Sequence, residues 1–219
     1  MKPLFITFEG LDGSGKSTHI AAAGLWFERR GLPAAVTKNP GGTRLGQCVR
    51  QAVLDPEAGH IDGRVEVLLM FADRRHNLLE VVEPALAEGR FVLCDRFSDS
   101  TRAYQGYGRG VPLEVIDRVD ELATAHRRPD RTILFDVTPA EAQKRGQSSS
   151  RRQQEGGVDR IDAEDLAFYE RVRKGYFELA ESEPSRFARV DAMGSREETW
   201  QQVEALLERW VEEARSLDP

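Results

Sequence analysis

The stretch that decides the fold is Phe5-Ile6-Thr7-Phe8-Glu9-Gly10-Leu11-Asp12-Gly13-Ser14-Gly15-Lys16-Ser17-Thr18. A short apolar run leads into the phosphate-binding pattern G-x-x-x-x-G-K-[ST], which extends from Gly10 to Ser17. In such a loop, glycines let backbone N–H groups point at phosphate oxygens, Lys16 adds a mobile positive charge, and the Ser17 hydroxyl can ligate Mg²⁺. A helix expected over residues 19–30 would direct its positive dipole end at the same anion. This context predicts a nucleotide site rather than an unrelated glycine-rich turn.

Length and charge narrow the class of protein. The chain has 219 residues, enough for one sizeable core and too few for two ordinary domains, so a single domain over residues 1–219 is expected. A net charge of −6 provides no basic footprint for a nucleic-acid binder. We therefore expect no nucleic-acid polymer as a partner.

The two cysteines, Cys48 and Cys94, are far apart and lack metal-type spacing, which disfavours a disulfide framework and a zinc site. Both are expected to be small buried residues in a reducing cytosol. The chain starts with a strand-like segment rather than a secretory signal, and no run approaches the roughly 20 apolar residues that span a bilayer. The sequence thus predicts a soluble, cytoplasmic protein without a membrane partner.

Strand-like and helix-like segments alternate along the chain. After the first strand, short apolar runs predict strands over residues 34–37, 91–94, 131–137 and 187–191. Helical patterns lie between them, over residues 45–54, 65–86, 112–125 and 166–180, and a capping pattern at Ser195 opens a last helix. Such alternation predicts an α/β fold, a three-layer α/β/α sandwich with a mostly parallel central sheet of the P-loop NTPase type.

Polar residues that follow expected strands are candidate site residues. Asp95 and Arg96 follow the buried strand over 91–94, which favours a site role over an ordinary surface ion pair. Pro40 and two glycines form a loop beyond the strand over 34–37, where a parallel sheet offers a ligand position, although a plain turn explains them equally well. Residues 98–110 are rich in hydrogen-bonding side chains and glycine, which indicates a recognition segment more than core.

Residues 147–157 contain hardly an apolar side chain and cannot bury themselves, so we expect this segment to be mobile. It carries Arg151 and Arg152. A plain surface loop is one interpretation. In a protein that handles phosphate, the alternative is a lid, at about residues 145–160, that closes over the donor and excludes water.

Four motifs together resemble the bacterial thymidylate (dTMP) kinases, a family of P-loop nucleoside monophosphate kinases. They are Phe8-Glu9-Gly10-Leu11-Asp12-Gly13-Ser14-Gly15-Lys16-Ser17, Pro40-Gly41-Gly42-Thr43, Asp95-Arg96 and the segment Ser100-Thr101-Arg102-Ala103-Tyr104-Gln105-Gly106-Tyr107-Gly108-Arg109-Gly110. The first motif alone indicates only an NTPase, whereas the last is specific to this family. The match keeps the family's order and covers nearly the whole chain, up to Tyr176.

The resemblance implies that ATP donates its γ-phosphoryl group to dTMP in the presence of Mg²⁺, yielding dTDP and ADP for dTTP synthesis. It also implies a homodimer. By resemblance, Lys16 and Ser17 hold the donor phosphates and the metal, and Asp95 supports the metal and its waters. The residues implied to bind the acceptor are Asp12, Arg50, Met70, Phe71, Arg74, Arg96, Thr101 and Gln105.

The phosphate-binding loop contains no arginine. This resembles the family members that carry their catalytic arginine in the lid, which implies a catalytic role for Arg151 or Arg152, with Arg145 and Arg160 nearby. Phosphoryl transfer asks for such residues, because an arginine supplied to the transferring group raises the rate by roughly 10³ to 10⁵.

Two positions depart from the family pattern. Asn39 replaces the usual glutamate before Pro-Gly-Gly, and Met70 occupies the position of the aromatic residue that stacks on thymine, four residues before Arg74. A polarisable thioether can cover a base. Either the register slips by one so that Phe71 stacks, or the pocket accepts a modified pyrimidine.

The leading hypothesis is therefore a dTMP kinase, and a kinase for another pyrimidine deoxynucleoside monophosphate is the alternative. A non-catalytic nucleotide-binding protein is the rival from another class, disfavoured because the catalytic residue types are present. A GTPase switch is weaker still, since the chain lacks an Asn-Lys-x-Asp segment for guanine. The choice between ATP and GTP as donor is left open by the sequence.

Overall fold

A parallel five-stranded sheet forms the centre of the protein. The computed structural model describes residues 1–147 and 159–216. In the sheet the strand order is β2-β3-β1-β4-β5, and every neighbouring pair is parallel. The strands are β1 (Phe5–Gly10), β2 (Ala34–Lys38), β3 (Phe91–Asp95), β4 (Arg131–Asp136) and β5 (Phe187–Asp191). The expected α/β fold with a mostly parallel central sheet is thus confirmed.

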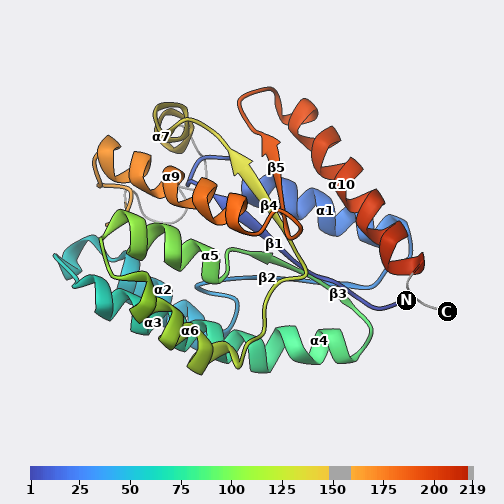
Figure 1. Cartoon of the computed structure of the whole chain (residues 1–219), viewed down its shortest axis with the longest axis horizontal. Helices are drawn as coiled ribbons and strands as arrows, with labels where there is room; N and C mark the ends of the chain where they lie inside the picture. The colour runs from blue at the N-terminus through green and yellow to red at the C-terminus, as the bar shows by residue number, and fades with distance from the viewer. Residues whose placement is uncertain (148–158, 217–219) are drawn as a thin grey trace.

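Helices cover both faces of the sheet (Figure 1). Ile6 packs with the cluster that includes α1 (Lys16–Arg29) and α10 (Arg196–Ser216), while the preceding Phe5 packs with residues of η2 (Leu78–Val82) and α4 (Glu83–Ala87). Successive side chains of a strand point to opposite faces, so β1, which is buried along its whole length, contributes side chains to both layers. The remaining helices are α2 (Arg44–Leu54), the 3₁₀ turn η1 (Pro56–Ala58), α3 (Gly63–Asn77), α5 (Ser98–Thr101), η3 (Arg102–Gly108), α6 (Leu113–Thr124), α7 (Pro139–Gln147) and α9 (Leu166–Ser182).

The helix expected over residues 65–86 is present but is not uniform. It consists of α3, the π-helical turn η2 and α4, which continue one another. Pro84 at the start of α4 has no N–H to donate to the carbonyl of Glu80, and its ring would collide with that carbonyl in an ideal α-helix. The wider turn before Pro84 accommodates this conflict.

The segment over residues 98–110 is also helical, as α5 followed by the π-helix η3. Most of its side chains are buried, so it belongs to the core as well as to the candidate site. Cys94 is buried as expected, but the expectation for Cys48 is wrong because Cys48 lies on the solvent-exposed side of α2. Within the described residues, no helix is both long enough and apolar enough to cross a membrane.

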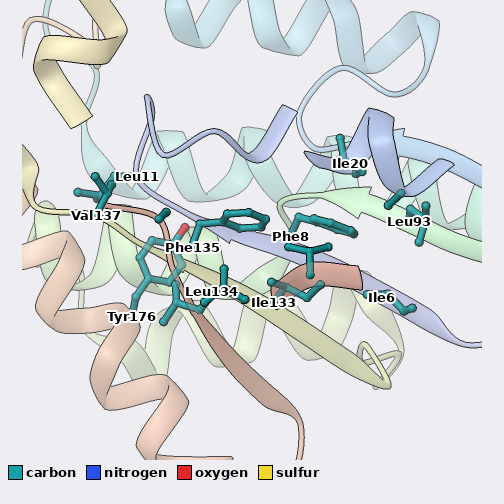
Figure 2. Packing of buried hydrophobic residues seen from close by; sticks show 14 of the residues in the cluster. Ile6, Phe8, Leu11, Ile20, Leu93, Ile133, Leu134, Phe135, Val137 and Tyr176 are labelled. Carbon is teal, nitrogen blue, oxygen red and sulfur yellow. The ribbon is translucent and has the colours of Figure 1, made fainter. Parts of the chain in front are cut away.

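Apolar side chains of β1 and β4 pack against each other next to the phosphate-binding loop. Figure 2 shows Phe8 and Phe135 side by side, with Ile133 and Leu93 packed around them. The two rings are stacked with centroids 6.1 Å apart, and both side chains are fully buried. Burial of one such side chain stabilises the fold by about 1.5–3 kcal/mol. This packing fixes the point at which the phosphate-binding loop leaves the sheet.

Candidate active site

The phosphate-binding loop lies between β1 and α1, at the centre of the sheet. From β1 the chain crosses to β2 on one side, and from β3 it crosses to β4 on the other. Ligands of parallel α/β sheets bind where connections diverge in this way. Gly13 in the loop has φ 83°, and a Cβ there would lie 2.1 Å from the carbonyl oxygen of Ala142 on α7. Only glycine fits this close approach.

Lys16 begins α1 and turns back over the loop. Its Nζ donates to the carbonyl oxygens of Gly10 (3.0 Å) and Leu11 (2.7 Å), and the residue is 5% exposed. Burial, followed by the nearby Arg96, lowers the pKa of Lys16 to about 8. At neutral pH the side chain is therefore still a cation, but one near its titration range.

One cavity borders the loop on the side of α7 and α10. It encloses about 340 Å³, within the range of about 300 to 1,000 Å³ common for small-molecule sites. Arg145 is held at its wall, because Nε donates to Glu141 (2.8 Å) and Nη1 to the carbonyl of Ala192 (2.7 Å). The lining residues are Ser14, Gly15, Thr18, His19, Arg145, Gly194, Arg196 and Thr199. We call this the donor-side cavity.

Ser17 and Asp95 meet at the ends of α1 and β3. The Ser17 hydroxyl donates to Oδ2 of Asp95 at 3.2 Å, while Oδ1 of Asp95 is buried without a hydrogen-bond partner. A hydroxyl next to a carboxylate oxygen that lacks a donor suits a hard cation, since Mg²⁺ prefers oxygen ligands. These two residues therefore fit a magnesium site.

Arg96 follows β3 and has φ 71°, a left-handed conformation that is strained for a non-glycine residue. Its Nη2 donates to Asp12 (2.9 Å) and to the Tyr104 hydroxyl (3.2 Å). Desolvation acts to raise the pKa of Asp12, but Arg96 and then Lys16 outweigh it and hold that pKa well below its usual range. Arg96 thus pairs with the phosphate-binding loop and not with its chain neighbour Asp95.

Glu9 anchors the other side of Arg96. Arg96 Nη1 donates to the hydroxyls of Ser100 (3.0 Å) and Tyr176 (3.1 Å). Both hydroxyls bond to Oε2 of Glu9, at 2.5 and 3.0 Å, and the Phe97 backbone N–H donates to its Oε1. Burial raises the pKa of Glu9 to about 7. Sequence reasoning missed these roles of Glu9, Ser100 and Tyr176, although a glutamate inside an apolar strand is itself an unusual signal.

A second cavity, which we call the acceptor-side cavity, opens between β3, α2, α3 and η3. Arg74 at its wall is 1% exposed; its Nη2 donates to the Phe97 carbonyl (2.9 Å) and the Thr101 hydroxyl (3.1 Å). Nε and Nη1 of Arg74 are buried without hydrogen-bond partners. Lining residues include Asp12, Asn39, Pro40, Arg50, Leu54, Met70, Arg74, Arg96, Ser100, Thr101, Tyr104, Gln105, Asp159 and Ile161.

Met70 and Phe71 face different surroundings. Met70 lines the acceptor-side cavity, whereas Phe71 packs in a cluster with Val67 and Ile116. The Phe71 ring also lies 4.5 Å from the Arg74 guanidinium. Consecutive residues on an α-helix point about 100° apart, so the two side chains cannot share one face. The structure therefore places the thioether, and not the ring, at the cavity.

Asn39 has a local role that explains its departure from the family pattern. Its Nδ2 donates to Oδ2 of Asp73 at 2.6 Å, and the Gly41 backbone N–H donates to Oδ1 at 3.2 Å. Burial raises the pKa of Asp73. A glutamate at position 39 would set a second acceptor-only group against this carboxylate. The amide instead ties the loop before α2 to α3.

Arg151 and Arg152 lie outside the described residues. Arg160 contacts the end of α2 and the start of α3, since its Nε donates to the Val53 carbonyl (3.0 Å) and its Nη2 to Glu66 (2.5 Å). Asp159 and Ile161, which sequence reasoning did not single out, complete one wall of the acceptor-side cavity.

Fold and site together define a P-loop phosphotransferase: a phosphate-binding loop after the first strand, a lysine over it, and one cavity bordering it on each of two sides. The family model for thymidylate kinase matches residues 8–203. A thymidylate kinase of Desulfosudis oleivorans is 42% identical over 94% of this chain and 97% of its own length. One from Neisseria gonorrhoeae is 43% identical over 95% of this chain and 98% of its own. The chain belongs to the thymidylate kinase family.

Proposed function

We propose that this protein is a dTMP kinase, which transfers the γ-phosphoryl group of ATP to dTMP and yields dTDP and ADP, a step toward dTTP. One observation carries the proposal. The phosphate-binding loop contributes Ser14 and Gly15 to the donor-side cavity and Asp12 to the acceptor-side cavity. Two phosphorylated substrates bound there would bring their phosphate ends together at the loop.

Positioning and charge supply most of the catalysis in such a reaction. The transferring group develops little covalent contact with protein, so the enzyme has to align donor and acceptor and neutralise their oxygens. Lys16 and the loop N–H groups serve the donor phosphates. Arg96 and Arg50 line the acceptor-side cavity and would hold the acceptor phosphate. Because Arg96 is held from both sides by hydrogen bonds, it needs little reorganisation during the reaction.

We further propose Mg²⁺ as the cofactor, held by Ser17 with support from Asp95. When bound, the ion supplies positive charge to the oxygens of the donor phosphates. We assign the lid and its catalytic arginine to residues 145–160, with Arg151 and Arg152 as the candidates. This assignment rests on the sequence, as does the placement of all 219 residues in one domain in the cytoplasm.

A homodimer is the proposed assembly. Family resemblance supports it, together with large apolar side chains exposed on two helices that pack against each other: Leu68 on α3 is 59% exposed and Leu122 on α6 is 84% exposed. The alternative of a modified pyrimidine acceptor is not favoured, because the relatives are named thymidylate kinases.

A panel of deoxynucleoside monophosphates assayed with ATP and Mg²⁺ tests the proposal. We expect dTMP to have the highest kcat/KM, and Lys16→Ala to lower the rate by about 10² or more, because it removes the cation over the loop. Far-UV circular dichroism checks that the variant is folded. Another monophosphate well above dTMP would overturn the proposed acceptor. ATP binding without any phosphorylated product would instead identify a non-catalytic nucleotide-binding protein.

A further inference from the structure

Glu66 is a fully buried carboxylate next to the acceptor-side cavity, in the first turn of α3. Its Oε1 accepts a hydrogen bond from Arg160 Nη2 at 2.5 Å and lies 3.4 Å from Arg109 Nε. Its Oε2 accepts one from Gln105 Nε2 at 2.7 Å. Glu66 thus forms ion pairs with the guanidinium groups of both Arg109 and Arg160.

An ionised carboxylate can only accept hydrogen bonds. The amide group of Gln105 must therefore turn its NH₂ toward Glu66, which leaves its carbonyl oxygen pointing away from Glu66. Gln105 is 2% exposed and lines the acceptor-side cavity. The orientation of a side-chain amide follows from its hydrogen bonds. For Gln105 the deciding partner is Glu66, which can only accept.

Arg74 provides hydrogen-bond donors that complement the carbonyl oxygen of Gln105. Its buried Nε and Nη1 lack hydrogen-bond partners, and the residue lines the same cavity. The cavity thus combines a fixed donor with a fixed acceptor. Thymine and uracil have a carbonyl oxygen next to a ring N–H, whereas cytosine has an exocyclic NH₂ next to an unprotonated ring nitrogen. The two edges carry their donor and acceptor in opposite order, so a donor and an acceptor fixed in place to match the first edge cannot match the second.

We propose that Glu66 is the positioning residue that selects the base: it holds the Gln105 amide with its oxygen toward the substrate, so that the site accepts pyrimidines with a ring N–H and rejects cytosine. This inference rests on the proposed function and adds the source of its base specificity. Glu66 itself does not touch the substrate; it acts through Gln105.

Glu66→Gln tests the proposal with nearly unchanged shape. The new amide is expected to turn its oxygen to Arg109 and Arg160 and its NH₂ to Gln105, which reverses the Gln105 amide and faces its NH₂ toward the base. An unmatched buried donor then lowers kcat/KM for dTMP by about 10- to 100-fold. We expect dUMP to fall in parallel, because its base has the same edge. The dTMP:dCMP ratio should fall, while the dTMP:dUMP ratio stays constant.

Glu164→Gln is the matched control. Glu164 forms an ion pair with Arg109 in the same cluster but has no hydrogen bond to Gln105. This variant also removes one carboxylate charge, so a general effect of charge would appear in it. We expect its dTMP:dCMP ratio to equal that of the wild type.

Two further variants distinguish an effect through Gln105 from a purely structural role of Glu66. Glu66→Asp keeps the charge between the arginines, and therefore the fold, but withdraws the carboxylate from Gln105; its dTMP:dCMP ratio should fall several-fold. In Glu66→Gln combined with Gln105→Glu, position 105 has only oxygens, so an acceptor faces the base again and the ratio should recover. A purely structural role of Glu66 predicts no such recovery.

The outcomes separate this inference from the proposed function. A wild type that prefers dTMP, with variants that lower dTMP and dCMP equally, overturns the role of Glu66 and leaves the dTMP kinase intact. A wild type that phosphorylates none of the monophosphates overturns both. A dTMP:dCMP ratio that falls in Glu66→Gln and Glu66→Asp, stays at the wild-type value in Glu164→Gln and recovers in the double variant supports the proposal.

Discussion

Arg96 shows how single residues define this site. It takes up a left-handed backbone conformation that costs about 1–3 kcal/mol. Its guanidinium is held by the hydrogen bonds that it donates to Asp12, Tyr104, Ser100 and Tyr176. The strain is localised where an acceptor phosphate would bind. A cation held in this way is preorganised, so its side chain needs little rearrangement when an anion binds.

Lys16 carries the pH dependence expected at the residue scale. With a pKa of about 8 it is charged below pH 8 and neutral above it, so the unliganded protein loses the cation for ATP as pH rises. We expect kcat/KM for ATP to fall about tenfold per pH unit above pH 8. The kcat should hold to higher pH, because bound phosphates stabilise the ammonium group.

A kinetic profile from pH 6 to 10 at saturating dTMP measures both quantities. The control is Lys16→Arg, whose guanidinium stays charged throughout this range; its residual activity should lack the alkaline decline. A flat kcat/KM between pH 7 and 9 in the wild type would contradict the lowered pKa.

At the scale of elements, α9 and η3 bring the later half of the chain to the first loop. They pack so closely that a Cβ on Gly175 would lie 2.5 Å from the Tyr107 ring. This close approach places the next residue, Tyr176, beside Glu9 of β1 and Arg96. The position of a helix distant in sequence thereby controls the guanidinium at the candidate site.

Tyr176→Phe tests this control. Loss of the hydroxyl removes its hydrogen bonds with Arg96, Glu9 and Ser100. The KM for dTMP should therefore rise about fivefold, and the free energy of unfolding should drop by about 1 kcal/mol. Steady-state kinetics and urea denaturation measure the two effects. Tyr107→Phe is the control, since its hydroxyl bonds only to the exposed Glu178 across the same interface. Equal KM values in the two variants would refute the role of Tyr176.

At the scale of the whole molecule, the proposed assembly is a homodimer. Its expected contact area involves α3 and α6, where Leu68 and Leu122 are exposed. Phe71, which packs α3 against α6 instead of lining the acceptor-side cavity, keeps these two helices together.

Leu122→Arg should convert the dimer to a monomer, because a charge would be buried in an apolar contact. Light scattering after size exclusion measures the mass. Leu25→Arg is the control: Leu25 is 51% exposed on α1, away from α3 and α6, and this variant should keep the mass of the wild type. A wild type that is monomeric at micromolar concentration would sink the proposed assembly.

The elements of the fold and the phosphate-binding loop were predictable from sequence. Short apolar runs, capping residues and the glycine pattern act on neighbours a few residues away, so the chain itself displays them. The family also followed from local motifs and is confirmed by the family model. The π-helical turn before Pro84 and the exposure of Cys48 were not predicted, since each depends on how a helix is oriented or distorted by packing.

The sequence by itself determined where the phosphate-binding loop lies and which family the chain belongs to. Only the tertiary structure decided that Arg96 pairs with Asp12, 84 residues away, and that Tyr176 reaches Glu9, 167 residues away. It likewise set Met70 rather than Phe71 on the acceptor-side cavity and joined Glu66 to Gln105. Local sequence patterns specify helices, strands and loops, whereas the partner of a buried charge depends on which distant element packing places beside it.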